Sequence, residues 1–290
     1  FMKSKLLAIF LLFIGNIALS QTDTTLTKDT STYRIIKTDG GELIGQIQSQ
    51  DAREILLLTK DDRQIYIPQH AIKEIIKLKN SDFNNIGTFI GEDKFATRYF
   101  ITTNGLPIKK GEHYVQWNLF GPDFQFGIGK DLGVGIQSSW FGVPIIGSIK
   151  KSWQIGDKSQ FAIGGLVGTG SWALPEFGGA LPFATLSFGD RSKNIAFSGG
   201  YGAIWTGDGV SGRAISSIAG MAKISPKISL VFDSFVLLPN ENQTGGALFI
   251  PGIRWHQEEG KAIQFGFAGI IADGFIVPVP IPTVQWYRSL

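Results

Sequence analysis

The chain contains no cysteine among its 290 residues, so disulfides, thiolate metal sites and cysteine nucleophiles are excluded. Charge is also sparse, because Asp, Glu, Lys and Arg together make up 18% of the residues and the formal net charge is only +3. A charge balance this small provides no electrostatic footprint for nucleic acid. A hydrophobic content of 43% argues against a disordered chain. We therefore expect a folded protein that binds no nucleic acid.

Long hydrophobic runs are missing except near the start of the sequence. Lys3 and Lys5 precede the apolar run 6–14, and Ala18-Leu19-Ser20 is a small-x-small cleavage pattern before Gln21. A helix over 6–19 would span ~21 Å, which is short of the ~30 Å of a bilayer core. We therefore expect residues 1–20 to be a signal peptide, with an N-terminal membrane anchor as the alternative. Without a cysteine at the cleavage site, lipoprotein processing is excluded.

The charged residues are spread unevenly along the rest of the chain. Residues 21–112 contain 26 of them, whereas the much longer stretch 113–290 contains 23. This shift separates a polar N-terminal part from a more apolar C-terminal part. The polar, Thr-rich residues 21–32 are expected to form a flexible lead.

Residues 33–78 contain five short strand signals separated by turn residues. The segments are YRIIKT, ELIGQIQS, REILLLT, QIYIP and IKEIIKL. With the Asp39-Gly40-Gly41 turn, the mid-strand Gly45 and the bend from Pro68 to Ile72, this region resembles a small five-stranded SH3-like or Sm-like barrel. That resemblance, in a protein expected to be exported, implies a structural or protein-docking module rather than an RNA-binding one. The Asn- and Gly-rich residues 79–94 are expected to be a linker.

From residue 95 onward the sequence alternates with a period of two, and no helical period competes with it. In 132–140, for example, Leu132, Val134 and Ile136 share one face, whereas Gly133 and Gly135 share the other. About twelve strands are predicted. Their approximate ranges are 95–103, 112–128, 132–141, 144–154, 160–171, 177–189, 194–205, 212–224, 228–238, 245–256, 261–272 and 279–289. The pair Gly121-Pro122 interrupts the second of them, where we expect a bulge, and Pro251 lies inside another.

The small face of these strands carries Gly, Ala, Ser and Gln but few charges. A water-soluble sandwich would cover its outer face with charged side chains. A large apolar face opposite a small one instead suits a transmembrane barrel, whose bulky side meets lipid. In lipid such a sheet must close, because open edges would leave backbone groups unpaired. The sequence therefore predicts an all-β fold, in which an antiparallel transmembrane β-barrel over 95–290 follows the small β domain.

The connections and the tryptophans support this interpretation. Every second connection is short and polar, and most of the others are longer, as expected for periplasmic turns and external loops. The tryptophans fall near the predicted strand ends, as an aromatic girdle at each membrane interface requires. Trp117, Trp140, Trp172 and Trp205 are assigned to the outer ends, and Trp153, Trp255 and Trp286 to the inner ends.

A signal peptide, a small β module and Gly- and aromatic-rich strands at the end of the chain resemble exported outer-membrane β-barrel proteins of Gram-negative bacteria. The segment RYFITTNGLPIKKGEHYVQ (98–116) resembles the opening of an uncharacterised group of that class. The resemblance implies insertion into the outer membrane by the barrel-assembly machinery, contact with outer-membrane lipid and a small domain in the periplasm. It implies no specific activity.

Few residues suggest chemistry, and we expect no catalytic residue, no metal and no cofactor. The three histidines, His70, His113 and His256, are expected to lie apart on the surface, with His113 at an outer strand end. Only His113 with Ser138 or Ser139 is conceivable as a lipid-hydrolase pair. Four charges point inward on the predicted parity, either as a selectivity cluster or as ion pairs that brace the barrel. They are Asp123, Arg213, Asp233 and Arg254.

The leading hypothesis is an outer-membrane barrel with a structural or passive transport, pore-type role and a periplasmic module that binds a protein partner. Two alternatives are a lipid-modifying barrel enzyme and an exported soluble β-protein that binds a partner. Dependence on detergent separates the soluble protein from the other two.

Overall fold

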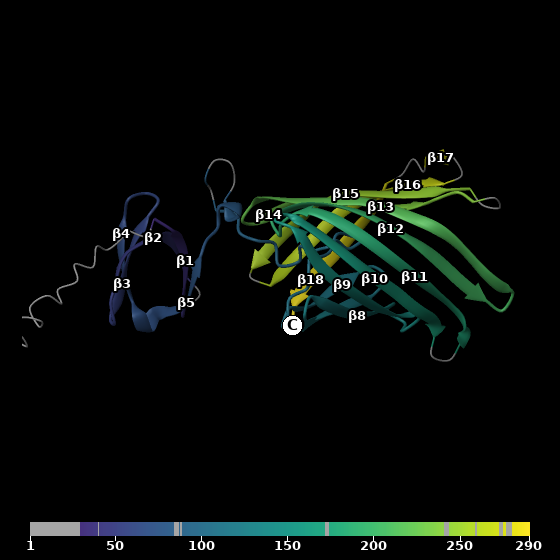
Figure 1. Cartoon of the computed structure of the whole chain (residues 1–290), viewed down its shortest axis with the longest axis horizontal. Helices are drawn as coiled ribbons and strands as arrows, with labels where there is room; N and C mark the ends of the chain where they lie inside the picture. The colour runs from purple at the N-terminus through teal and green to yellow at the C-terminus, as the bar shows by residue number, and fades with distance from the viewer. Residues whose placement is uncertain are drawn as a thin grey trace, which may run out of the picture. The chain divides into compact units, whose positions relative to one another are not determined.

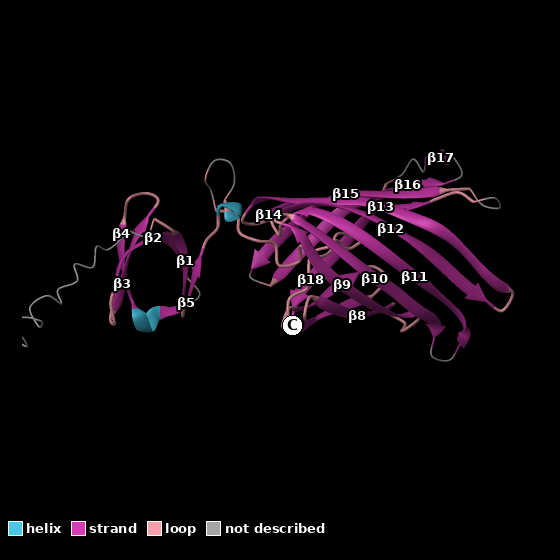
Figure 2. Cartoon of the chain, in the orientation of Figure 1, coloured by secondary structure: helices cyan, strands magenta, loops and turns pink. Residues whose placement is uncertain are grey.

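The computed structural model describes residues 30–39, 41–83, 87, 89–171, 174–240, 244–258, 260–272, 275–276 and 280–290. These fall into two compact units, residues 1–79 and residues 80–290. Strands form nearly all the regular structure of both units (Figure 2). Two short 3-10 helices are also present, η1 (Gln69–Ala71) and η2 (Asn80–Asp82). In the described part of the chain, no helix is long and apolar enough to cross a membrane. The expected signal peptide and most of the lead lie outside the described residues.

The first unit is a five-stranded antiparallel sheet of order β4-β3-β2-β1-β5. Its strands are β1 (Thr32–Lys37), β2 (Glu42–Gln50), β3 (Glu54–Thr59), β4 (Gln64–Pro68) and β5 (Ile72–Lys77). Ile35, Ile55, Leu57 and Ile67 form its buried core. A Cβ atom at Gly45 would lie 2.2 Å from the carbonyl oxygen of Leu58, which explains the glycine inside β2. The five predicted strands are confirmed, and the kinship with SH3-like or Sm-like domains stays a prediction.

The second unit is a closed antiparallel barrel (Figure 1). Its strands are β6 (His113–Asn118), β7 (Pro122–Gly129), β8 (Leu132–Ser138), β9 (Ile145–Gly156), β10 (Ser159–Ser171), β11 (Leu174–Gly189), β12 (Lys193–Thr206), β13 (Gly209–Ser225), β14 (Ile228–Leu237), β15 (Gly246–Glu258), β16 (Lys261–Ala272), β17 (Phe275–Ile276) and β18 (Ile281–Ser289). Pairing of β18 with β6 and of β15 with β16 closes the sheet. The short β17 pairs only with the end of β16, so twelve of the 13 strands make the wall. The predicted barrel is confirmed.

The first two predicted barrel strands are wrong in detail. Residues 95–103 form no strand of the wall, and the range 112–128 contains two strands, β6 and β7, so the total is unchanged. The expected bulge at Gly121-Pro122 is a tight hairpin, in which the N–H groups of Asn118 and Gly121 bond to each other's carbonyl oxygens. Gly121 has a φ of 150° and a Cβ there would lie 2.1 Å from the oxygen of Ser138, so only glycine fits.

The two ends of the barrel differ in their connections. We call the end that holds the C-terminus the near end, because the N–H of Leu290 bonds to the carbonyl of His113 there. The near-end turns contain two or three residues each, as predicted. At the far end, 139–144, 238–245 and the stretch around β17 are longer, but β6 and β7 are joined by residues 119–121 and β12 and β13 by Gly207 and Asp208, so the predicted asymmetry holds only in part. β12 and β13 extend into the connection expected at 206–211, and β13 reaches 17 residues whereas β8 has 7.

Large apolar side chains face outward and small or polar ones face inward, as predicted. Phe197 and Phe265 are each 43% exposed on the outside of the barrel, whereas their neighbours Ala196 and Gln264 are 1% and 0% exposed on the inside. A soluble sandwich would bury the large residues and expose the small ones. The barrel therefore presents a broad apolar outer surface, of the kind that hydrocarbon solvates.

Pro251 fits into β15 because the ladder is interrupted beside it. Pro251 lies opposite Phe232 of β14, but on the other side the β15–β16 register passes from Phe249–Gly269 to Gly252–Gly266 without a pair at Pro251. The missing N–H of proline therefore removes no bond from the β15–β16 ladder.

Candidate functional site: a plugged lumen

Residues 93–108, which we call the plug, lie inside the barrel. The segment expected to be a linker belongs from residue 80 onward to the barrel unit, and Asp93 is fully buried. Tyr99, Phe100 and Leu106 of the plug pack in one core cluster with residues of the wall. The wall residues of this cluster are Ala196, Ala219, Met221, Val231, Ile250 and Ala268.

The small inward residues of the wall make room for the plug. A Cβ at Gly252 or Gly266 would lie 2.4 or 2.5 Å from the Cζ atom of Phe100. A Cβ at Gly133 would lie 2.8 Å from Ile108, again inside normal contact distance. The alternating glycines of the strands therefore fit a filled lumen.

Arg254 anchors the start of the plug. Its guanidinium is completely buried and donates to the carboxylate of Asp93 (3.0 Å) and to the carbonyls of Phe95 (2.9 Å) and Arg98 (2.6 Å). Its Nε donates to Gln264 at 2.7 Å, and the guanidinium lies over the ring of Tyr287, 4.6 Å from its centroid. This one side chain thus ties three residues of the plug to β15, β16 and β18.

Asp93 completes the same anchor from the plug side. Its carboxylate lies 3.3 Å from Nε2 of His256 and accepts from the Ser229 hydroxyl at 3.1 Å. Burial opposes its ionisation, but the charges of Arg254 and His256 outweigh that effect and hold the pKa of Asp93 well below its usual range. The plug therefore begins with an ionised carboxylate that lies between Arg254 and His256.

Two further carboxylates of the wall hold the middle of the plug. Asp233 accepts from the N–H groups of Ile101 (2.7 Å) and Thr102 (2.9 Å) and from the Thr102 hydroxyl (2.6 Å). Asp123 forms an ion pair with Arg98. Each carboxylate thus fixes a different point of the plug.

The C-terminal part of the plug is held by Lys150 of β9 and by Arg191 of the turn after β11. Lys150 is 7% exposed, and its ammonium donates to the Thr103 hydroxyl (3.0 Å) and to the carbonyls of Asn104 (2.9 Å) and Leu106 (3.0 Å). After the plug, Arg191 pairs with Glu112 through two hydrogen bonds of 2.7 and 2.8 Å.

The structure places the four predicted inward charges at separate points. Asp123, Asp233 and Arg254 are each at most 1% exposed and each contacts the plug. Arg213 lies closer to the far end, where its Nη1 donates to the carbonyl of Thr244 at 3.2 Å. Three of the four therefore serve the same segment from different strands, and Arg213 stands apart from them.

Sequence reasoning missed the partners of these charges, because they lie in a segment interpreted as linker and strand. They are Asp93, which pairs with Arg254, and Arg98, which pairs with Asp123. Lys150, a wall residue of β9, was overlooked as well. The pair Asn104-Gly105 followed by Pro107 is a turn signal that argues against a regular strand, and it was the available hint.

Each described tryptophan lies within three residues of a strand end. Trp140, Trp153, Trp255 and Trp286 are 43–57% exposed, and Trp172 lies outside the described residues. Trp117 is directly opposite Trp286 in the β6–β18 register, so these two are level rather than at opposite ends. The barrel wall is short along the strand direction at this point, because β6 contains only 6 residues. The girdle itself stays a prediction.

The expected places of two histidines are wrong. His113 lies at the near end, level with Phe126 and Val134, because β6 runs in the direction opposite to the predicted one. Ser138 is four residues beyond Val134 along β8, about 13 Å away, so the conceivable hydrolase pair does not form. His256 is not on the surface but belongs to the Asp93 anchor.

Asp93, His256 and Ser229 contain the residue types of a hydrolase triad but not its geometry. Ser229 Oγ and Asp93 Oδ2 both approach the same Nε2 atom of His256, at 2.9 and 3.3 Å. A triad needs the carboxylate on Nδ1 and the hydroxyl on Nε2. Ser229 is also fully buried and bonds to Asp93 itself, so these residues serve as an anchor. Among the described residues, no three His, Asp or Glu side chains are placed to hold a metal ion.

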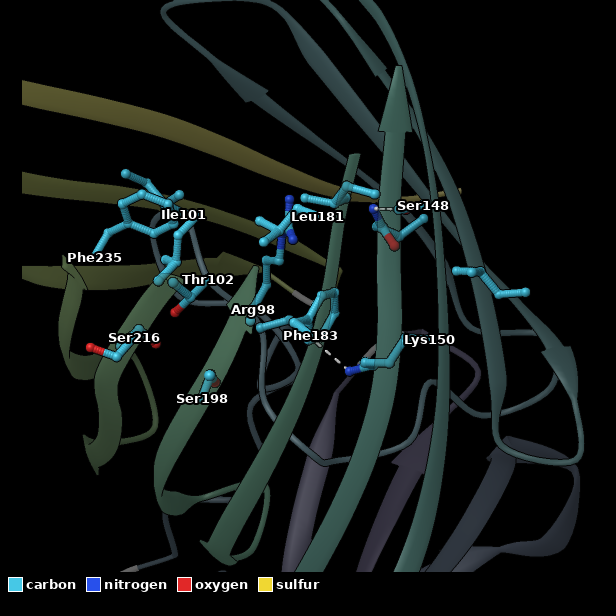
Figure 3. Close-up of a pocket in the computed structure, with 18 of the residues that line it drawn as sticks. Arg98, Ile101, Thr102, Ser148, Lys150, Leu181, Phe183, Ser198, Ser216 and Phe235 are labelled. Atoms are coloured by element: carbon cyan, nitrogen blue, oxygen red, sulfur yellow. Dashed lines mark hydrogen bonds between the residues drawn. The ribbon is translucent and has the colours of Figure 1, made fainter. Parts of the chain in front are cut away.

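Beyond the plug the lumen opens into a chamber (Figure 3). The floor cavity, about 110 Å³, lies against Arg98 and Ile101 of the plug, and an adjoining cavity of about 660 Å³ continues it. The two cavities share the wall residues Leu166, Leu181, Ile215 and Phe235. The lumen is therefore filled at one end and hollow at the other, and the hollow part is lined by large apolar side chains that the predicted small face did not include.

No protein-family model and no curated protein matches the chain. Three solved structures of membrane barrels resemble it at low similarity. The NanC porin has 10% identity and a TM-score of 0.42 over 62% of this chain and 98% of its own. The outer-membrane expressed OmpT of Vibrio cholerae has 10% identity and a TM-score of 0.40 over 90% and 95%. The outer membrane channel DcaP of Acinetobacter baumannii has 9% identity and a TM-score of 0.35 over 90% and 94%.

Proposed function

We propose that this protein is an outer-membrane barrel of the pore type, whose lumen is closed in this conformation by its own plug. The apolar outer surface supports the membrane location, because a band of exposed aromatic and aliphatic residues around a closed sheet is stable only against hydrocarbon. The same surface argues against an exported soluble β-protein.

The plug supports a transport role over a purely structural one. Besides its apolar contacts with the wall, it is held by ion pairs and single hydrogen bonds, such as Asp93 with Arg254 and Thr102 with Asp233. Contacts of this type can exchange with water or with a ligand, whereas a lumen filled from all sides by apolar side chains would have no way to open. The hollow chamber beyond the plug is the single observation that carries the proposal, because a scaffold needs no such space.

We further propose that the small β domain lies in the periplasm and binds a protein there. Its link enters the barrel just before Asp93, where the carbonyls of Gly91 and Glu92 accept from Ser192 (3.0 Å) and Lys223 (2.9 Å). A partner that pulls on this domain would therefore load these two bonds and then the Asp93–Arg254 anchor. Insertion by the barrel-assembly machinery and contact with outer-membrane lipid belong to the same proposal.

Planar-bilayer conductance tests the proposed function. Residues 93–108 are replaced by a Gly/Ser linker of equal length, which removes the anchors but keeps the chain connected. The wild-type protein is expected to conduct rarely, and the linker variant steadily, because its lumen lacks the plug. A variant without residues 30–79 serves as the control and should behave like the wild type. A folded linker variant that is as silent as the wild type would contradict the proposal.

A further inference from the structure

The chamber combines apolar walls with charges of a single sign. Its described charged residues are Arg98 and Lys150 at the floor and Arg213 toward the far end. The described lining contains no Asp or Glu, and Asp123, the partner of Arg98, does not line the cavity. A ligand in this chamber therefore meets basic side chains and no acidic side chain at the described surface, since Asp123 lies behind Arg98.

Arg98 has donors to spare for such a ligand. Of the five N–H groups of a guanidinium, the hydrogen bonds of Arg98 use one on Nε, to Gln116, and one on Nη2, to Asp123. Its side chain is partly exposed, at 14%, and lines the floor cavity. The remaining N–H groups match the geometry of a carboxylate or a similar oxyanion.

Lys150 contributes in a different way. Its three N–H donors are already taken by Thr103, Asn104 and Leu106 of the plug, so it has no spare hydrogen bond for a ligand. An anion beside it would compete with these plug oxygens for the ammonium.

The walls determine the rest of the ligand. The lining includes Leu181, Phe183 and Phe235, which are labelled in Figure 3, and also Leu166 and Ile215. A small hydrophilic anion would leave most of this apolar surface against water. An apolar body buries it, at roughly 25 cal/mol per Å². The adjoining cavity of about 660 Å³ is within the range of ligand pockets, roughly 300–1,000 Å³.

We infer that the chamber binds an amphipathic anion, with an oxyanionic head at Arg98 and Lys150 and a single hydrocarbon body along Leu181 and Ile215. The inference rests on the proposed function and deepens it by naming a class of substrate.

Calorimetric titration of the full-length protein in phosphatidylcholine nanodiscs tests this inference, with empty nanodiscs as the blank for partitioning. The probes are decanoate, decanol and decyltrimethylammonium, which share a tail and differ in the head. Saturable binding of one decanoate per barrel is expected, with decanol and the ammonium at least about tenfold weaker, since a hydrogen bond to a charged group is worth roughly tenfold or more. Absence of saturable decanoate binding, or equal binding of decanol, would overturn the inference.

Two variants locate the site. Leu181→Trp fills the chamber without changing its charge or the hydrogen bonds of the plug, and it should abolish decanoate binding. Arg98→Gln should weaken it about tenfold or more. Lys151→Gln, which changes an outward lysine beside Lys150, should leave binding unchanged. If Leu181→Trp folds and still binds decanoate as the wild type does, the ligand is elsewhere and the inference fails. Decanoate binding is measured separately from the conductance of the linker variant. Failure of the binding experiment therefore does not imply failure of the proposed pore function, and the reverse also holds.

Discussion

The anchor formed by Arg254 allows the sharpest prediction about the plug. Arg254→Met keeps the length and the apolar stem of the side chain but removes its guanidinium. That group makes five described hydrogen bonds, and three of them end on the plug, at Asp93, Phe95 and Arg98. Removing one partner of a buried ion pair costs about 3–5 kcal/mol, because the other charge is left in place.

The substitution should lower mainly the free energy of plug docking. The stability of the wall should change little, because the backbone hydrogen bonds between its strands do not involve the guanidinium. The undocked population should therefore rise roughly a hundred- to several-thousand-fold. Limited trypsin digestion followed by mass spectrometry measures it, since cleavage after Arg98 requires the plug to leave the lumen. The variant should be cut there at a rate that the wild type does not approach.

Two controls make the result decisive. Arg288→Met removes an exposed arginine near the same end of the barrel and should leave Arg98 protected. Heat-modifiable migration on a gel should show that both variants have folded barrels. If Arg254→Met folds and protects Arg98 as well as the wild type does, the anchor does not hold the plug and the reasoning is refuted.

Three further predictions follow from the fold. Phe197→Arg should destabilise the barrel in liposomes by about 2–4 kcal/mol in urea titrations, because it puts a charge on the lipid side, whereas Phe197→Leu should cost far less; equal effects would contradict the lipid-facing assignment. Gly266→Ala should cost about 1–3 kcal/mol by crowding Phe100, and Phe100→Leu should relieve part of that cost in the double variant; strict additivity in the mutant cycle would show that the contact is absent. Leu57→Ala should lower the free energy of unfolding of the small domain by about 2–5 kcal/mol, measured by hydrogen exchange, while the heat-modifiable migration of the barrel stays unchanged. If the barrel also lost its heat-modifiable migration, the two units would not be independent.

The wall of the barrel could be predicted from the sequence because its rule is local. Alternation with period two assigns each residue to a face, and the residue types on the two faces tell lipid from lumen. In β12 this assigned Phe197 outward and Ala196 inward without any knowledge of the neighbouring strands. The five strands of the small domain were predictable for a similar reason, since turn residues bound each of them.

The plug could not be predicted, because what holds it is distant in sequence. Ile101 and Thr102 bond to Asp233, 132 and 131 residues away, and no local pattern encodes such a pairing. The stretch Arg98–Thr103 also alternates well enough to resemble a strand. The inward charges were identifiable by parity, but not their partners. The sequence therefore offered a selectivity cluster or ion pairs that brace the barrel, and neither alternative included an anchored segment.

The apolar chamber was hidden for another reason. In β10 and β11, Leu166 and Leu181 point inward although their parity was expected to carry small residues. Where both faces of a strand are apolar, alternation disappears, and the sequence alone does not tell a lined cavity from a lipid contact.

Single-cysteine labelling along β12 tests the central claim most directly, since the chain has no native cysteine. A spin label at position 197 should collide with lipid-dissolved oxygen, and a label at 196 should be shielded from both oxygen and a water-soluble nickel reagent while the plug is docked. When the linker replaces residues 93–108, the label at 196 should become accessible to the nickel reagent, and the accessibility of the label at 197 should not change. Water access at 197, or a label at 196 that ignores the loss of the plug, would contradict a lipid-facing barrel closed by its own chain.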